Sequence, residues 1–257
     1  MKNIKIFSCS EEADEFTNKI CEKLGEPIGK INRFNWSDKK DQPRIPITAK
    51  LIAELIEAAG ATRVLTCDLH NPAIEAYFNI NCDVISARFE LEKYFQNKNI
   101  ENFVVVATDA GSSKKAYKYA EYFKCGIALA QKHREGNTDT VSTDNIIGEV
   151  EGKNALIFDD EIDTAGSILE TAKVLKRNGA KNIFVGATHG ILSSNAIERI
   201  EKSDIKEVVI TDTVPHSNLS NNIKVLSFTN FICKSNKISK WRRFTWWTFW
   251  KIKMSDK

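Results

Sequence analysis

The chain has 257 residues, of which 42% are hydrophobic and 28% charged, a composition typical of a globular protein that buries a core. No stretch approaches the roughly 18 consecutive apolar residues of a membrane helix, and acidic residues appear too early for a secretory signal peptide. The net charge is +3, but eight Lys or Arg and one Asp lie from residue 234 onward, so the preceding residues carry 29 basic and 33 acidic groups. These figures exclude membrane, disordered and collagen-like classes.

The cysteines are scattered along the chain without a C-x-x-C pair. There are six of them: Cys9, Cys21, Cys67, Cys82, Cys125 and Cys233. This spacing argues against a structural zinc site and against a disulfide framework. We therefore expect reduced thiols and a cytoplasmic location.

Short apolar strands alternate with amphipathic helices along the chain. We expect strands at 4–7, 63–67, 103–107, 126–130, 155–158, 183–187 and 207–210, and helices at about 10–25, 48–59, 88–97, 114–123 and 166–177. This alternation is typical of βαβ units, in which parallel strands form a sheet with helices on its faces. The sequence therefore predicts an α/β fold with mainly parallel sheets, and ligand binding at the carboxyl ends of the strands.

The segment from Asp159 to Ser167, DDEIDTAGS, lies directly between a predicted strand and a predicted helix. Thr164, Gly166 and Ser167 would place hydroxyls and backbone N–H groups at the start of that helix, where the peptide dipoles favour a phosphate. The paired acids upstream suit a vicinal diol, because one carboxylate accepts two hydrogen bonds. A simple helix cap needs a single acid, so the segment predicts a site for a phosphorylated sugar.

DDEIDTAGS resembles the ribose-5-phosphate loop of type I phosphoribosyltransferase folds, and specifically that of the ribose-phosphate pyrophosphokinase family. The resemblance extends through PRIPITAKLIAELIEAAGATRVLTCDLH (43–70), VVVATDAG (104–111), NIIGEVEGKNALIFDDEIDTAGS (145–167), KVLKRNGAKNIFVGATHGILSSNAIERI (173–200) and ITDTVP (210–215). It implies two phosphoribosyltransferase-like (type I) domains. The first, at 1–84, is truncated, the second spans 85–232, and a basic and aromatic tail follows at 233–257.

The resemblance also implies an activity and its residues. The diphosphoryl group of ATP would be transferred to the C1 hydroxyl of ribose 5-phosphate, giving 5-phosphoribosyl 1-pyrophosphate and AMP, with Mg²⁺ as cofactor. By their positions in the matching motifs, His70 and Asp109 would bind magnesium, and Lys132 and Arg134 would be the catalytic residues. The residues that would bind ribose 5-phosphate are Arg134, Asp159, Asp163, Thr164, Ala165, Gly166 and Ser167.

These assignments agree with the chemistry. One imidazole and one carboxylate leave most of the coordination to water and ATP phosphates, as magnesium prefers. Cations fixed on a loop over the transferred group would lower the barrier to diphosphoryl transfer.

Each assignment also has a structural alternative. A His at the end of a strand is often a hydrogen-bonding residue, and an Asp before a Gly is often a turn residue. The triplet Lys132-His133-Arg134 follows a predicted strand, and such a triplet is commonly a solvated loop. For Lys114 and Lys115 the sequence allows two roles, either phosphate binding or a solvated start of a helix.

Two stretches depart from the family pattern. After Asn35 the chain lacks the block that carries a Phe-x-Asp-Gly-Glu loop and an Arg-Gln pair in the family. Because that block supplies ATP contacts, some across a subunit interface, we expect a homo-oligomer with an incomplete nucleotide site and a broken first sheet. In the ending WRRFTWWTFW (241–250), a shift of the reading frame by one base across 245–250 requires Gly-Gly at the centre and permits a family-like Leu-Gly-Gly-Leu-Phe-Gly, from which we infer a frameshifted tail.

Three functions remain open from the sequence. The first is a ribose-phosphate pyrophosphokinase that uses ATP and ribose 5-phosphate, with activity impaired by the missing block. The second is an inactive regulatory or assembly homologue of that enzyme. The third, a plain phosphoribosyltransferase, is disfavoured because DLH and PRIPITAK are not expected in that class. A basic, Trp-rich tail would also suit nucleic acid or a membrane surface, but as a frameshifted segment it predicts neither partner.

Overall fold

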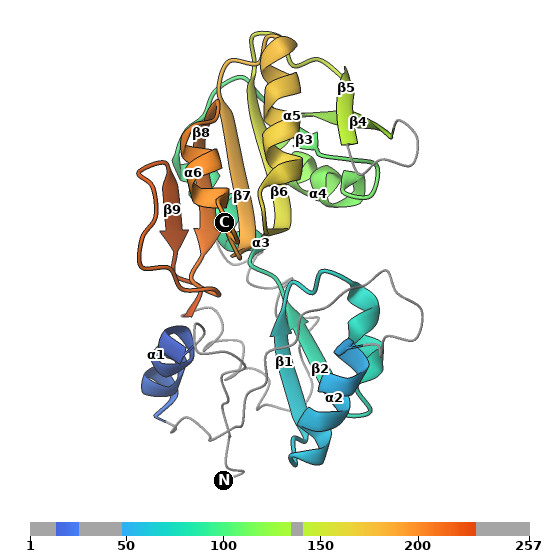
Figure 1. The fold of residues 1–257 in the computed structure, drawn as a ribbon, viewed down its shortest axis with the longest axis vertical. Coiled ribbons are helices and arrows are strands. Elements are labelled where there is room, and N and C mark those ends of the chain that lie inside the picture. The colour runs from blue at the N-terminus through green and yellow to red at the C-terminus, as the bar shows by residue number, and fades with distance from the viewer. Residues whose placement is uncertain (1–13, 26–47, 135–140, 230–257) are drawn as a thin grey trace. The chain divides into compact units, whose positions relative to one another are not determined.

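The computed structural model describes residues 14–25, 48–134 and 141–229 (Figure 1). The chain divides into two compact units, one formed by 1–85 with 228–257 and the other by 86–227. The sequence predicted a boundary between residues 84 and 85. In the described part, no helix has the length and apolar character to cross a membrane. The cysteines described there are free thiols: Cys21, Cys67, Cys82 and Cys125.

The first unit contains a small parallel sheet. Its elements are α1 (Asp14–Leu24), α2 (Thr48–Ala58), β1 (Arg63–Cys67), a 3-10 helix η1 (Pro72–Tyr77) and β2 (Asn81–Ile85). β1 and β2 pair in parallel. Just after α2, Gly60 adopts a φ of +92°, the left-handed conformation in which glycine commonly ends a helix. The expected strand at 4–7 lies outside the described residues.

Large apolar side chains of this first unit remain exposed. Ile52 and Leu55 on α2 and Val84 on β2 are between 41% and 59% exposed. Among the described residues this sheet has two strands, and two strands bury little apolar surface by themselves. The interruption of the first sheet stays a prediction.

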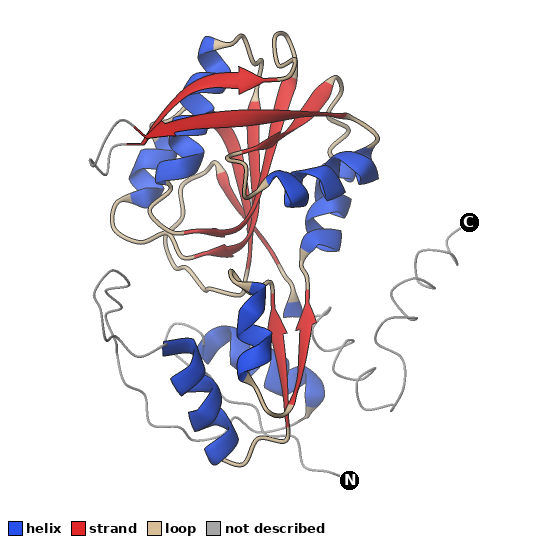
Figure 2. Ribbon diagram, turned by 90° about the vertical axis from the view of Figure 1, so that its right-hand side faces the viewer, coloured by secondary structure: helices blue, strands red, loops and turns tan. Residues whose placement is uncertain are grey.

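The second unit is a seven-stranded sheet in the order β5-β4-β3-β6-β7-β8-β9 (Figure 2). Its strands are β3 (Phe103–Ala107), β4 (Gly126–Arg134), β5 (Val141–Ile147), β6 (Asn154–Ile162), β7 (Ile183–Gly190), β8 (Ile205–Thr211) and β9 (Ile223–Leu226). Neighbouring strands are parallel except β4 and β5, which are antiparallel. The predicted fold class, α/β with mainly parallel sheets, is confirmed.

Helices cover both faces of this sheet. α3 (Arg88–Asn97) and α4 (Ser113–Phe123) pack on one face, and α5 (Gly166–Arg177) and α6 (Ala196–Glu201) on the other (Figure 1). Successive residues of a strand point to opposite faces. Ile157 therefore packs in the cluster under α5, whereas Phe158 stacks on Tyr119 of α4 with ring centroids 3.7 Å apart. Because these strands are buried on both faces, their sequences are apolar without alternation.

Two strands run further than the sequence predicted. The apolar runs end at Ala130 and Phe158, but β4 continues through Arg134 and β6 through Ile162. Backbone pairing extends them, because β5 pairs with the polar end of β4 and β7 with the polar end of β6. The prediction that Lys132-His133-Arg134 lies on a loop after the strand is therefore wrong. The short strands β2, β5 and β9 were not predicted either, because each mixes apolar with polar or charged residues and is kept in its sheet by backbone pairing.

Candidate functional site

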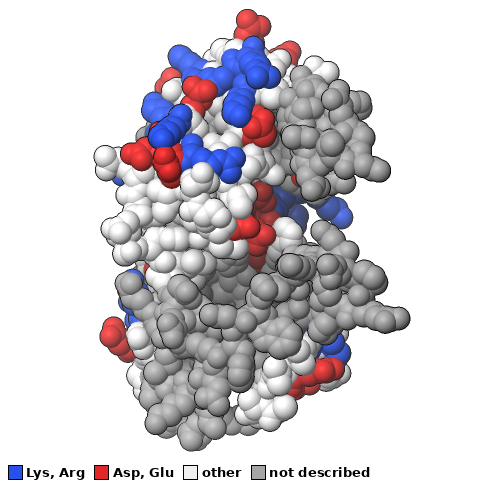
Figure 3. Space-filling view, in the orientation of Figure 1, with Lys and Arg blue, Asp and Glu red and all other residues white. Residues whose placement is uncertain are grey.

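The carboxyl ends of three neighbouring strands meet at one edge of the second unit. β6 lies between β3 and β7 and is parallel to both. Asp109 follows β3, and Asp159 to Glu161 form the polar end of β6. Figure 3 shows a group of acidic side chains toward this edge, whereas Lys and Arg mixed with acids cover the opposite end of the unit. The edge is where a ligand of an open α/β sheet is expected.

A lysine balances the two adjacent acids of β6. Lys115, in the first turns of α4, places Nζ 3.0 Å from Oδ1 of Asp159 and also pairs with Oδ1 of Asp160. The backbone N–H of Asp160 donates to Oδ1 of Asp159 at 2.9 Å. All three side chains are partly buried. The alternative of a solvated helix start is therefore wrong for Lys115, which sequence periodicity did not distinguish from its exposed neighbour Lys114.

Burial and charge act in opposite directions on this cluster. Burial and the neighbouring Asp160 raise the pKa of Asp159, although Lys115 opposes that rise. Burial alone would lower the pKa of Lys115, but the two carboxylates outweigh it, so this pKa lies above its ordinary value. Lys115 therefore stays protonated at neutral pH and favours the ionised form of both carboxylates.

The loop that follows β6 has a strained backbone. Ala165 directly precedes α5 and adopts a φ of +63° although it is not glycine, a conformation that costs about 1–2 kcal/mol. Its methyl side chain is buried in the core, which holds it in place. Ala165 has no side-chain group to cap the helix, so the positive end of α5 is available for an anion. Asp163 and Thr164 are exposed beside it.

The predicted magnesium ligands lie in different units. His70 is an exposed residue shortly after β1 in the first unit, and Asp109 belongs to the second. Asp109 also holds the turn before α4, because its Oδ1 accepts the backbone N–H of Ser112 at 2.8 Å. The turn role considered in the sequence analysis is therefore present, and a magnesium site shared by His70 and Asp109 stays a prediction.

The predicted catalytic pair lies on the extended end of β4. In the pairing with β5, Lys132 is opposite Thr143 and Arg134 is opposite Val141. The side chains of 132–134 lie outside the described part of the chain. Their catalytic role, and the contact of Arg134 with ribose 5-phosphate, therefore remain predictions.

Comparisons with known proteins agree with the resemblance. A phosphoribosyl synthetase-associated domain model matches residues 141–240. A ribose-phosphate pyrophosphokinase of Caldanaerobacter subterraneus subsp. tengcongensis is 49% identical over 179 residues, which are 69% of this chain and 56% of that protein. The Thermotoga maritima protein of the same name is 46% identical over 198 residues, 76% of this chain and 62% of that protein. The chain thus spans little more than half the length of these curated relatives.

One solved structure has a similar fold. The phosphoribosylpyrophosphate synthetase from Mycobacterium smegmatis superposes with a TM-score of 0.77 over 93% of this chain and 99% of that chain. Its sequence identity is 23%, so this likeness supports the fold alone.

We predict that Lys115→Met lowers the free energy of unfolding by about 1–2 kcal/mol at pH 7, since two partly buried carboxylates would lose their cation. The loss should shrink as the pH falls toward 4. A raised carboxyl pKa in the folded state disfavours folding above that pKa, and protonation of the acids removes this penalty. Urea denaturation of wild type and variant between pH 4 and 8 measures the difference in the free energy of unfolding at each pH.

Lys114→Met is the matched control, because it removes the same charge from the neighbouring exposed position. We expect its effect to stay within about 0.5 kcal/mol at every pH. A Lys115→Met loss that is independent of pH would contradict the charge balance described above.

Proposed function

Over the residues that match these relatives the chain belongs to the ribose-phosphate pyrophosphokinase family, and on that premise we propose that it binds ribose 5-phosphate and transfers the diphosphoryl group of ATP to it. The observation that carries the proposal is the continuous run from Asp159 to Ser167, which joins an acid pair to a helix start at one sheet edge. An acid pair suits sugar hydroxyls, and an uncapped helix start suits a phosphate. The two ends of a phosphorylated pentose thus have adjacent binding groups.

In this proposal two parts of the segment contact two parts of the substrate, the ribose hydroxyls and the 5-phosphate. Asp159 accepts hydrogen bonds from the ribose hydroxyls, and Lys115 beside it favours its ionised form. The segment from Asp163 to Ser167 holds the 5-phosphate with backbone N–H groups and hydroxyls. The residues are Asp163, Thr164, Ala165, Gly166 and Ser167, with Arg134 added from β4.

The donor set proposed for magnesium suits that ion. His70 supplies an imidazole and Asp109 a carboxylate, and both are accessible to solvent, so water and ATP phosphates would complete the coordination. The bond from Ser112 to Asp109 orients the carboxylate, as outer hydrogen bonds orient metal ligands. Bound Mg²⁺ would neutralise charge on the phosphate oxygens of ATP.

The reaction we propose is a displacement at the β-phosphorus of ATP. The C1 hydroxyl oxygen of ribose 5-phosphate forms the new bond to the β-phosphorus and releases its proton to water, and the bond between the β-phosphorus and the oxygen of the α-phosphate breaks, so that AMP leaves with that oxygen. Lys132 and Arg134 would stabilise negative charge on the transferred group. The cellular location that we propose is the cytoplasm, and the assembly is a homo-oligomer.

A second function from the sequence analysis stays as an alternative, although no comparison supports it. It rests on the resemblance, by which the family's ATP-binding block is absent after Asn35. An inactive regulatory or assembly homologue would keep the fold and the sugar loop while lacking nucleotide binding.

We predict that the double change Thr164→Val and Ser167→Ala weakens ribose 5-phosphate binding by about tenfold or more, since it removes two hydroxyl donors at the phosphate end. Isothermal titration calorimetry gives the dissociation constants. Thr164→Ser, which keeps the hydroxyl, should bind within about threefold of wild type. Unchanged binding by the double variant would refute the assignment of this loop.

We also predict that the 257-residue chain forms 5-phosphoribosyl 1-pyrophosphate at least about 100-fold more slowly than a chain with the missing block and the in-frame ending restored. A misplacement of about 1 Å can cost roughly this factor, and an unanchored adenine should cost more. The assay is ATP-dependent product formation by the two purified chains.

Equal turnover of the two chains would show that the block is dispensable and that the proposed deletion has no effect on activity. Absence of product from the restored chain would instead favour the inactive assembly homologue.

A further inference from the structure

The end of β6 at Ile162 and the loop that follows it are held from one side by the chain segment after β7. Backbone N–H groups of Ile191 and Leu192 donate to the carbonyl oxygen of Ile162 at 2.9 and 3.0 Å. The N–H of Ser193 donates to the carbonyl oxygen of Asp163 at 3.2 Å. Two consecutive carbonyls, at the end of β6 and the start of the loop, therefore accept hydrogen bonds from backbone donors of the same segment.

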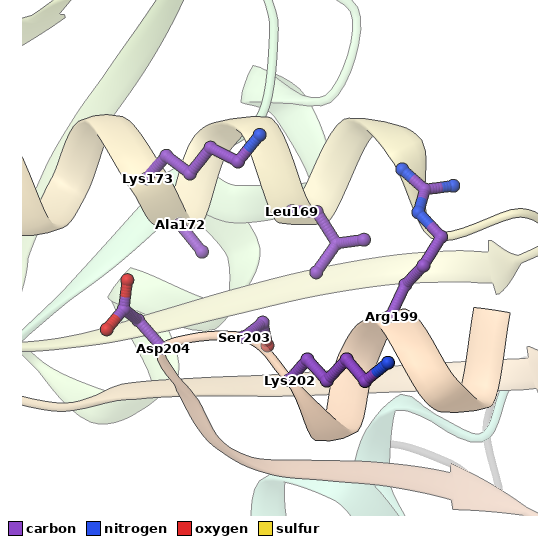
Figure 4. Close-up of a pocket in the computed structure, with 7 residues that line it drawn as sticks. All are labelled: Leu169, Ala172, Lys173, Arg199, Lys202, Ser203 and Asp204. Atoms are coloured by element: carbon purple, nitrogen blue, oxygen red, sulfur yellow. The ribbon is translucent and has the colours of Figure 1, made fainter.

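The third carbonyl has a side-chain donor. Nη1 of Arg199 donates to the carbonyl oxygen of Thr164 at 2.8 Å. Arg199 lies on α6, and Figure 4 shows its guanidinium reaching the start of α5, where the loop ends. Lys202, the residue directly after α6, lines together with Arg199 a cavity of about 300 Å³ between α5 and α6 (Figure 4).

The helix that carries Arg199 is rigidly anchored. Ala196 and Ile200 are fully buried in the core cluster that also contains Ala165. Ala165 and the helix that carries Arg199 therefore pack in the same core cluster, so Arg199 contacts Thr164 from a fixed position. A donor held in this way can fix the orientation of the peptide between Thr164 and Ala165.

The orientation of that peptide matters to an anion. A carbonyl oxygen that accepts from Arg199 is directed toward the cation and keeps its negative partial charge there. The following N–H, that of Ala165, belongs to the same planar peptide unit and points away from the carbonyl. Holding the Thr164 carbonyl toward Arg199 therefore directs the Ala165 N–H to the other side of the loop.

We propose that Arg199 is a positioning residue for the 5-phosphate of the substrate. It does not itself bind the phosphate, but orients the Thr164–Ala165 peptide so that the loop presents N–H groups to it. This inference rests on the proposed function, because it assumes that the loop holds the phosphate of ribose 5-phosphate. It adds a residue outside the loop and outside the segment that the resemblance assigned to binding.

The test compares three variants of the full chain: Arg199→Met, Arg199→Lys and Lys202→Met. Lys202→Met removes one positive charge from the residue directly after α6, which lines the same cavity as Arg199, but Lys202 pairs with Glu198 and makes no described contact with the loop. Dissociation constants are measured for ribose 5-phosphate and for D-ribose by NMR titration, and folding of each variant is checked by thermal unfolding.

We expect Arg199→Met to weaken ribose 5-phosphate binding about three- to tenfold, the range of an ordinary hydrogen bond, because Arg199 acts through the peptide and not on the phosphate itself. D-ribose, which lacks the phosphate, should bind the variant and wild type equally. Arg199→Lys should recover part of the loss, and Lys202→Met should have little effect. Without ligand, the backbone N–H resonances of Ala165 and Gly166 should shift in Arg199→Met and not in Lys202→Met.

Three results would overturn the inference. The first is equal binding of ribose 5-phosphate by Arg199→Met and wild type, and the second is an equal loss in Lys202→Met, which would indicate a general charge effect. The third is an equal loss for D-ribose, which would indicate general damage to the site. If wild type itself fails to bind ribose 5-phosphate, the proposed function fails, and the N-H resonances of Ala165 and Gly166 then decide whether Arg199 orients the loop.

Discussion

The parallel pairing of β6 with β3 and β7 is the constraint on which the candidate site depends. β6 is the middle strand of the seven, and its carboxyl end extends past the apolar run into Asp159 and Asp160. Pairing with β7 continues through Glu161 and Ile162, so the acids stand on a fixed strand and not on a loop. Groups positioned on such rigid elements are held more accurately than groups on loops.

That position carries an electrostatic penalty, which the fold offsets locally. Two adjacent carboxylates at a partly buried strand end repel each other, and Lys115 of α4 lies against both. The left-handed Ala165 adds backbone strain a few residues later. Strain and paired charges of this kind persist where packing fixes them, and they are commonly found at functional sites. Arg199 of α6 adds a further contact to the same loop, a hydrogen bond from its guanidinium to the carbonyl oxygen of Thr164.

Much of the second unit could be predicted from the sequence because its strands are apolar on both faces. The bounds of α3, β3 and α5 agree with the expected 88–97, 103–107 and 166–177. The ends of β4 and β6 could not be predicted, since polar residues there are kept in the sheet by partner strands distant in sequence.

The local motif of the site could also be predicted from the sequence, but its contacts with distant residues could not. The motif from Asp159 to Ser167 is local, so its position between strand and helix follows from the sequence. Lys115 and Arg199 contact that motif only through the packing of α4 and α6, and no pattern in the sequence distinguishes them from neighbouring Lys and Arg residues. The Arg199 contact in particular joins two residues that lie 35 positions apart in the sequence.

A crystal structure of the chain with ribose 5-phosphate tests the central claim most directly. We expect the phosphate within hydrogen-bond distance of the backbone N–H groups at the start of α5, and the ribose hydroxyls at the Asp159 carboxylate. A phosphate bound elsewhere on the second unit, or a sugar bound in the reverse direction, would contradict the account.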